Sequence, residues 1–299
     1  MHIDSFLTYI RCELNLSAHT VSSYKTDLVQ WRNYCTDNKP EEFYPLDITP
    51  LDIRQWISHL ANKNSSQRTI RRKIQAVRAF YNYLMKYHGL KSNPATEITL
   101  AKIDKPLPIY IRPVETNRIL SETWDHDDYI ETRDRLIILM FYSTGIRCSE
   151  LMTLLDANVN TARGELKVLG KRNKERIIPF GEELSEMITL YRRLRDDIVE
   201  SPEPQFFLRP TGEPLYRNLI YNIVHRTLSG RVHSERQSPH VLRHSFASDM
   251  LNNGADINAV QQLLGHKSLA TTQMYTHITY RELKHNYELA HPRALKKGG

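Results

Sequence analysis

A proline-containing stretch near residue 105 divides the sequence into two helical parts. The run Lys102-Ile103-Asp104-Lys105-Pro106-Leu107-Pro108 mixes charges with two prolines and interrupts every helical periodicity. Proline removes a backbone donor and restricts the residue before it, so a helix does not continue through such a stretch. We predict an N-terminal domain over residues 1–101, a linker over 102–112 and a C-terminal domain over 113–299. The alternative is a surface loop within one domain.

The first hundred residues have the pattern of four helices. Ser17, Thr49 followed by Pro50, and Ser66 are each suited to cap the start of a helix. After Ser66, apolar residues recur at helical spacing up to Leu84 and mark one buried side. We therefore predict an all-α four-helix N-terminal domain.

The second part is again mainly helical but contains one strand-like hairpin. Residues 164–169 and 175–179 have strand character, and the basic sequence 170–174 lies between them. The predicted fold class is accordingly mainly α: the N-terminal helical domain is followed by an α+β, mostly helical domain with a small β-sheet.

Positive charge is concentrated in the first third of the chain. The 41 Lys and Arg residues outnumber the 34 Asp and Glu residues, for a net charge of +7. Residues 67–91 contain no acidic residue, which favours a polyanion as partner; a solvated helix face is the alternative. The predicted DNA contacts in this stretch are Arg68, Arg71, Arg72, Lys73 and Arg78.

Other classes of protein fit the sequence poorly. The longest apolar run, Leu136–Tyr142, is far too short to span a bilayer, and the N-terminus lacks the pattern of a secretion signal. The three cysteines are scattered without CxxC spacing, which argues against disulfides and a cysteine metal site. We expect a cytoplasmic protein that does not contact membranes.

Basic and aromatic residues in the second part form a spaced set with a common chemistry. Arginine and lysine neutralise a phosphate, histidine hydrogen-bonds to it, and a tyrosine hydroxyl can attack it, all without a metal or other cofactor. The set consists of Arg147, Lys171, His240, Arg243, His266 and Tyr275.

Local sequence suggests how some of these side chains are presented. Arg147 follows a glycine between two predicted helices, and Glu150 could hold its guanidinium, although such a pair is commonly structural. Pro239 predicts a helix start, which places His240 in the first turn and Arg243 one turn later. Tyr275 is one of 16 tyrosines, so its assignment depends entirely on the other residues of the set.

Four motifs in this order resemble those of the tyrosine recombinases, most closely the Xer-type enzymes that resolve chromosome dimers. The motifs are Thr-Gly-Ile-Arg147-Cys-Ser-Glu150, Gly-Lys171-Arg-Asn-Lys-Glu-Arg, Pro-His240-Val-Leu-Arg243-His, and Leu-Leu-Gly-His266 continuing through Met-Tyr275-Thr-His. The likeness extends over almost the whole chain. One departure is Arg172, which stands where relatives commonly have glycine.

The resemblance implies a DNA-cleaving function. Tyr275 would attack a DNA phosphodiester to form a 3′-phosphotyrosyl bond, assisted by His240. Arg147, Arg243 and His266 would bind the phosphate oxygens, and Lys171 would protonate the leaving 5′ oxygen. Apart from the resemblance, the basic neighbours Arg172, Lys174 and Arg176 could each make a simple phosphate contact, and the predicted DNA contacts among them are Arg172 and Lys174.

The resemblance also implies an assembly. Four protomers, either identical or including a related recombinase, would bind two double-stranded recombination sites, and the last helix, around Tyr280–Leu289, would dock into a neighbouring protomer. Alternatives with the same chemistry are a mobile-element integrase, a DNA invertase and a type IB topoisomerase. A non-catalytic DNA-binding regulator is the alternative from another class.

Overall fold

The computed structural model describes residues 2–100, 110–170, 175–200, 203–234, 236–265 and 279–294. The chain divides into two compact units, Met1–Pro106 and Leu107–Gly299. Each unit has a hydrophobic core of its own. The change from one unit to the other falls at Pro106, in the proline-containing stretch.

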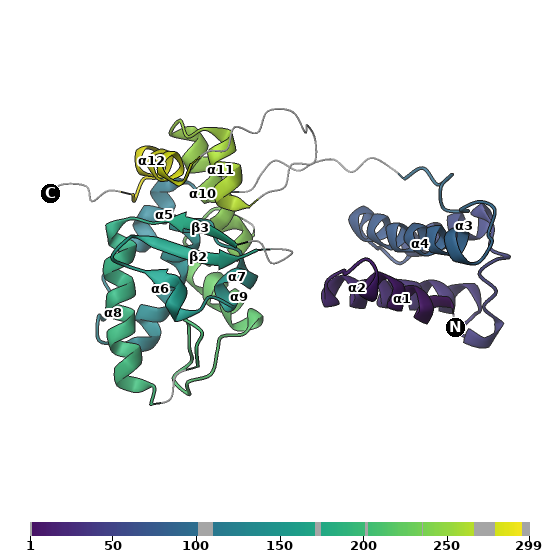
Figure 1. Cartoon of the computed structure of the whole chain (residues 1–299), viewed down its shortest axis with the longest axis horizontal. Coiled ribbons are helices and arrows are strands. Elements are labelled where there is room, and N and C mark those ends of the chain that lie inside the picture. Colours follow the sequence, from purple (N-terminus) through teal and green to yellow (C-terminus); the bar gives the residue numbers. More distant parts are fainter. Residues whose placement is uncertain are drawn as a thin grey trace. The chain divides into compact units, whose positions relative to one another are not determined.

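The first unit consists of helices (Figure 1). They are α1 (His2–Cys12), α2 (Ala18–Cys35), the 3-10 turn η1 (Pro40–Glu42), α3 (Pro50–Asn62) and α4 (Gln67–Tyr87). The predicted caps are confirmed: Ser17 and Ser66 each accept a hydrogen bond from a backbone N–H three residues on. Thr49 forms a capping box with Asp52.

Aromatic side chains fill the core of the first unit. Trp31 of α2 and Trp56 of α3 are buried, with ring centroids 4.9 Å apart. On α4, the predicted apolar face from Ile70 to Leu84 is buried. The helical periodicity in the sequence therefore identified the inward side of α4 correctly.

The second unit combines a small sheet with several helices (Figure 1). In chain order its elements are α5 (Pro113–Leu120), α6 (Tyr129–Thr144), α7 (Cys148–Met152), η2 (Asp156–Asn158), β1 (Val159–Asn160), β2 (Glu165–Leu169), β3 (Glu175–Pro179), α8 (Glu182–Ile198), α9 (Arg217–Leu228), α10 (Pro239–Asn252), α11 (Ile257–Leu264) and α12 (Tyr280–Ala290).

The sheet is antiparallel, with strand order β1-β2-β3. Leu166 of β2 pairs with Ile178 of β3, and both side chains are buried. The two strands of the predicted hairpin are therefore confirmed. Residues 171–174, in the predicted turn between them, lie outside the described part of the chain.

Helix α6 lies at the centre of the second unit and packs against α8, α9 and α10. Its apolar run Leu136–Tyr142 is completely buried, as expected of a helix that is apolar on all sides. Across the described residues, no helix has the length and apolar character needed to cross a bilayer.

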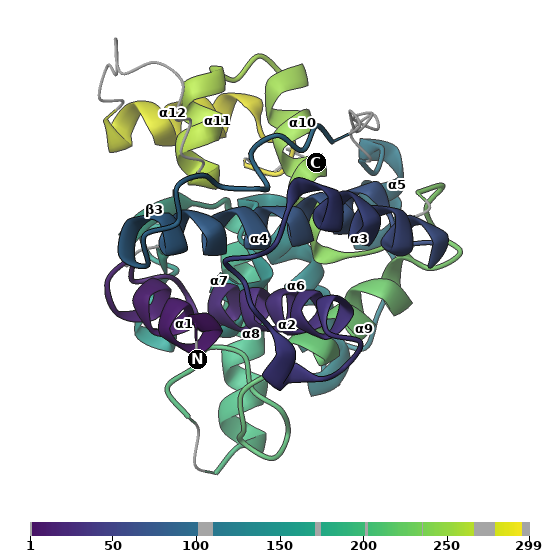
Figure 2. The same ribbon diagram turned by 90° about the vertical axis from the view of Figure 1, so that its right-hand side faces the viewer.

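Helices α10, α11 and α12 pack on one another at one end of the second unit (Figures 1 and 2). Leu283, Tyr287 and Ala290 of α12 are buried within this unit, whereas Leu289 is 72% exposed. Tyr287 thus packs within its own chain.

Candidate active site

Arg147 lies in the tight junction between α6 and α7. Gly145 ends α6 with φ of 59°, and a Cβ at this position would lie 2.5 Å from the Phe246 ring. Glycine is favoured here because it has no side chain to collide with the core and adopts positive φ readily. Two residues later, Arg147 caps α7, and its Nη1 donates to Oε1 of Glu150 at 2.7 Å. The predicted Arg147–Glu150 pair is present.

Glu150 is a buried carboxylate shared by two arginines. Besides Arg147, it accepts hydrogen bonds from both terminal nitrogens of Arg176, at 2.7 and 2.9 Å. Burial favours a higher pKa for Glu150, but the hydrogen bonds from Arg176 and Arg147 outweigh it and lower the pKa. Glu150 is therefore ionised at neutral pH and holds both guanidinium groups.

His240 and Arg243 begin α10, where Pro239 occupies the first turn as predicted. His240 is exposed. Partial desolvation, together with the positive charge of Arg243 and other nearby groups, lowers the pKa of His240. The imidazole is consequently neutral at neutral pH and can accept a proton.

Arg243 is buried and reaches across to two other helices. It donates to the backbone oxygens of Gly145 and Leu264, the latter at 2.6 Å. Burial, followed by the charge of Arg147, lowers the pKa of Arg243 to about 9. This value still leaves the guanidinium charged at neutral pH, so Arg243 carries a fixed positive charge into the interior of the unit.

Three arginines converge on the last carbonyl groups of α11. Arg176 Nε donates to Leu263 O at 2.8 Å and Arg147 Nη2 donates to Gly265 O at 2.8 Å. The Arg243 bond to Leu264 lies between these two. The final carbonyls of a helix lack partners within the helix and carry partial negative charge. The arginines satisfy these groups and hold the end of α11 against α7 and β3.

The cluster formed by Arg147, Glu150, Arg176 and Arg243 is electropositive. Three guanidinium groups stand against one carboxylate, which leaves two positive charges in excess. Of the two arginines that pair with Glu150, Arg147 has the more exposed side chain, at 32% against 13% for Arg176. An anion that approaches the cluster would therefore meet Arg147 first.

For Arg176 the sequence indicated only a simple phosphate contact, and no role in holding a carboxylate. The pattern in β3 contained a usable signal, because side chains alternate across a strand and Arg176 shares a face with the buried Ile178. An arginine on the inward face of a strand needs a buried acceptor. That acceptor is Glu150, which lies 26 residues earlier in the chain.

The structure brings Arg147, Glu150 and Arg243 into direct contact or close proximity, with His240 one turn before Arg243. The other residues predicted for this site and for the hairpin turn lie outside the described part of the chain. They are Lys171, Arg172, Lys174, His266 and Tyr275.

The basic residues of α4 have two different environments. Arg68 is exposed, Arg71 is half-buried, and Arg72 is half-exposed while paired with Asp27. Lys73, in contrast, is buried, and its ammonium binds Asp27 at 3.1 Å and also Gln30. The completely buried Asp27 requires a cation, which explains why Lys73 faces inward.

Arg78 also has a role within the first unit. Its Nε donates to Ala95 O at 2.9 Å and its Nη2 donates to Ile98 O at 2.5 Å. These bonds hold the segment after α4 against the helix. The prediction that the basic residues of α4 face a partner therefore conflicts with the structure at Arg78 and at Lys73.

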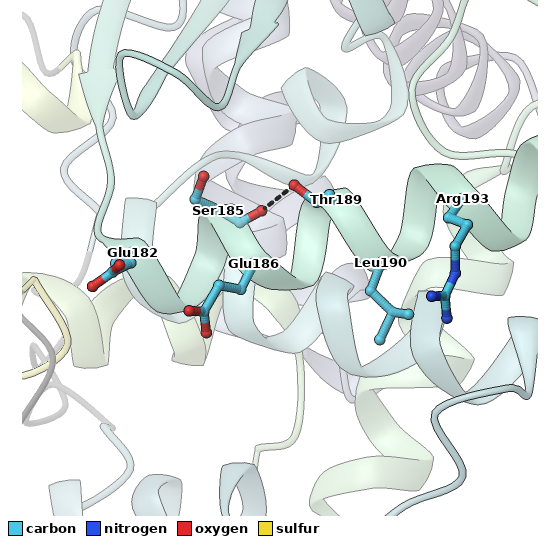
Figure 3. A pocket seen from close by; sticks show the side chains of 6 residues that line it. All are labelled: Glu182, Ser185, Glu186, Thr189, Leu190 and Arg193. Carbon is cyan, nitrogen blue, oxygen red and sulfur yellow. Dashed lines mark hydrogen bonds between the residues drawn. The ribbon is translucent and has the colours of Figure 1, made fainter. Parts of the chain in front are cut away.

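A shallow pocket lies along one face of α8 and contains none of the predicted site residues (Figure 3). Within it, Thr189 Oγ1 donates to Ser185 O at 2.9 Å, an ordinary bond within a helix. Because one helix supplies the whole lining, the pocket is a surface depression. The lining residues are Glu182, Ser185, Glu186, Thr189, Leu190 and Arg193.

Two family models match the chain. The model described as the phage integrase family matches residues 110–282, and that of the phage integrase N-terminal SAM-like domain matches residues 3–88. Together these two matches account for most of the second and first units, respectively.

Curated relatives and solved structures agree with these matches. Tyrosine recombinase XerC of Listeria innocua is 35% identical over 97% of both chains. The XerC of Chlorobaculum parvum is 33% identical over 98% of this chain and 94% of the relative. A crystal structure of the XerH site-specific recombinase in a post-cleavage complex with palindromic difH substrate shares the fold. It has a TM-score of 0.71 and 22% identity, and the match covers 96% of this chain and 83% of that one.

Proposed function

The chain belongs to the phage integrase family of tyrosine recombinases, and we propose that it is a Xer-like site-specific recombinase that cleaves and rejoins DNA through a 3′-phosphotyrosyl intermediate. The observation that carries this proposal is the cluster of Arg147 and Arg243 beside His240. A phosphodiester placed there would meet fixed positive charge and a neutral imidazole.

The arginines would act on the charge that develops at phosphorus. In the described residues, Arg147 donates to Glu150 and to Gly265 O, and its planar guanidinium has further N–H groups for non-bridging oxygens. These donors are held in place before substrate arrives, so little reorganisation is needed in the transition state. Arg243 and His266 would complete the binding of the phosphate oxygens.

Tyr275 is the proposed nucleophile. Its phenolic oxygen forms a bond to phosphorus as the bond to the 5′ oxygen breaks, which gives a 3′-phosphotyrosyl link and a 5′-hydroxyl. His240 takes the phenolic proton, and Lys171 supplies a proton to the leaving oxygen. A 5′-hydroxyl of the partner duplex then reverses these steps, so the bond energy is retained in the covalent link.

The proposed DNA contacts outside this site are Arg68, Arg71, Arg72, Arg172 and Lys174. Lys73 is not retained because it is buried and binds Asp27, and Arg78 is not retained because two of its donors bind the backbone oxygens of Ala95 and Ile98. The side chain of Arg72 also pairs with Asp27 but is 49% exposed, so it stays in the proposal. A tetramer on two sites and a role in chromosome dimer resolution in the cytoplasm belong to the same proposal. Their support is the near full-length match to the XerC relatives.

The test begins with the wild-type protein in cells. Mapping covalent protein–DNA adducts across the genome would identify the site, and a duplex of that sequence with a nick beside the cleavage point would trap the intermediate. Adducts confined to one chromosomal locus support dimer resolution, whereas adducts at the ends of mobile elements support integration. Plasmid relaxation without site dependence would indicate a topoisomerase.

We expect Tyr275→Phe to abolish the adduct on the nicked duplex while DNA binding in a band-shift assay is retained. Tyr280→Phe is the matched control, because it removes the hydroxyl of the tyrosine that begins α12, and it should form adduct at the wild-type rate. An adduct that persists in Tyr275→Phe would disprove the assignment of the nucleophile.

A further inference from the structure

We propose that Arg176 is a positioning residue for the cleavage reaction, holding the carboxylate that orients Arg147 and tying both to the end of α11. The inference rests on the proposed function, because Arg147 is its phosphate-binding group. Arg176 would touch neither the phosphate nor the nucleophile.

The bonding pattern around Glu150 is the first support. Each carboxylate oxygen receives one bond from each arginine: Oε1 accepts from Arg147 Nη1 and Arg176 Nη1, both at 2.7 Å. Oε2 accepts from the Arg147 backbone N–H at 2.8 Å and Arg176 Nη2 at 2.9 Å. Arg176 therefore fixes the plane of the carboxylate, and the carboxylate in turn fixes the direction of the Arg147 guanidinium.

The link to α11 is the second support. The third bond of Arg176, from Nε to Leu263 O, lies beside the bond from Arg147 to Gly265 O. Gly265 itself packs closely on Arg176, since a Cβ there would lie 3.3 Å from its Nη1. One side chain on β3 thus holds both the carboxylate of α7 and the end of α11.

The geometry demands a guanidinium and not merely a positive charge. Lysine is a point charge on a flexible stem and cannot make the two-pronged bond to Glu150 together with the bond to Leu263 O. Without the two-pronged bond, Arg147 alone would orient the Glu150 carboxylate, whose side chain is 3% exposed. The Arg147 guanidinium would then be drawn toward Glu150 and away from the phosphate.

The competing interpretation is that Arg176 binds a DNA phosphate directly. Its side chain is only 13% exposed, and its donors point at Glu150 and Leu263. A direct contact would contribute to DNA affinity and to its salt dependence. A positioning role would appear in the cleavage rate alone.

The test measures single-turnover adduct formation and site affinity for Arg176→Lys on the nicked duplex. We expect cleavage to slow by about 10–100-fold, by analogy with the loss of a partner that orients a metal-binding side chain. The dissociation constant and its salt dependence should stay at wild-type values. Arg176→Lys combined with Glu150→Gln should be no slower than the slower single variant, because both changes break the same bridge.

Arg195→Lys is the matched control for a buried arginine pair. The side chain of Arg195 is 8% exposed and donates to Asp156 at 2.8 Å in the same unit, away from the Glu150 cluster. The Arg195→Lys substitution should lower the melting temperature of the protein without slowing cleavage. If Arg176→Lys fails to fold, Glu150→Gln alone supplies the test, since it removes the carboxylate and leaves β3 unchanged.

The outcomes separate this inference from the proposed function. Absence of adduct with the wild-type protein overturns the proposed function. Adduct formation by a folded Arg176→Lys or Glu150→Gln variant at the wild-type rate overturns the positioning role alone. A loss of affinity that matches the loss of rate, with a weaker salt dependence, also overturns it and identifies a direct phosphate contact.

Discussion

The three arginines around Glu150 carry the same charge but have different roles, because their surroundings differ. Arg243 is buried and bound to two backbone oxygens, whereas Arg147 is the more open partner of Glu150. Arg176 lies between these extremes and uses its donors on Glu150 and Leu263. Residue type alone identifies a cation, but the acceptors already within reach decide whether it can bind a ligand or must position one.

The lowered pKa of His240 predicts how cleavage depends on pH. The neutral imidazole accepts the phenolic proton, so the rate should be constant near neutral pH and fall as His240 becomes protonated, below the ordinary value of 6.5. Cleavage rates of the wild-type protein and of His240→Gln between pH 5 and 8 check this. The variant should be about 10²–10⁴-fold slower at pH 7 and should lose the acid-side decrease.

His244→Gln is the control for that profile, because His244 lies one turn after His240 and is also exposed. His244 contributes to the lowered pKa of His240, so His244→Gln should shift the acid-side decrease to slightly higher pH. If His240→Gln showed the same acid-side decrease as the wild-type protein, another group would be the proton acceptor.

At the scale of elements, single side chains anchor helices that lie far apart in the sequence to one another. Arg243 connects α10 to the ends of α6 and α11. His291, immediately after α12, is buried between α6 and α12: it lies within hydrogen-bonding distance of Tyr142 O, at 3.2 Å, and stacks on the Tyr287 ring at 5.0 Å. Its Nδ1 accepts from the Arg293 N–H, so Nε2 carries the proton and donates to Tyr142 O.

The His291 anchor predicts a loss of stability in mild acid. Burial lowers the pKa of His291 to about 4, while the unfolded chain has the ordinary value of 6.5. Between these values the unfolded state binds more protons, so the stabilisation is complete above pH 6.5 and is lost as the pH falls toward 4. The difference corresponds to about 3 kcal/mol at most.

Urea unfolding of the full chain at pH 7.5 and pH 5, for the wild-type protein and His291→Gln, measures this effect. The wild-type protein should lose more stability between the two pH values than the variant. His285→Gln, at an exposed position on α12, should behave like the wild-type protein. Equal losses in the wild-type protein and His291→Gln would show that His291 does not stay neutral in the folded state.

At the scale of the whole molecule, the proposed DNA contacts are divided between the two units, whereas the proposed chemistry belongs to one. The basic residues of α4 lie in Met1–Pro106, whereas every proposed catalytic residue lies in Leu107–Gly299. The cores are separate: Trp31 and Phe80 belong to one, and Phe141 and Phe246 to the other. Each unit can therefore bury its own apolar surface.

Separate cores predict that a fragment of residues 1–106 folds by itself. It should unfold cooperatively when helical circular dichroism is followed on heating, and it should bind duplex DNA weakly with strong salt dependence. It should form no covalent adduct. A fragment that unfolds without a cooperative transition would mean that the first unit needs the second for its stability.

Much of the architecture follows from local sequence. The caps at Ser17, Thr49 and Ser66, the inward face of α4 and the strands of the β2–β3 hairpin were all predicted correctly. These features depend on neighbours a few residues apart, which sequence patterns record directly. The order of the motifs likewise indicates the family without reference to any contact.

Local patterns do not show which basic side chains are bound inside the protein, because their partners are distant in the sequence. Lys73 and Arg78 match the basic pattern of α4, yet Asp27 and the carbonyls of Ala95 and Ile98 bind them internally. The acceptor of Arg176 lies 26 residues away, and one acceptor of Arg243 lies 98 residues away. Spacing along the chain indicates which charges are available, but folding brings their acceptors together, and so decides which charges face outward and which are enclosed.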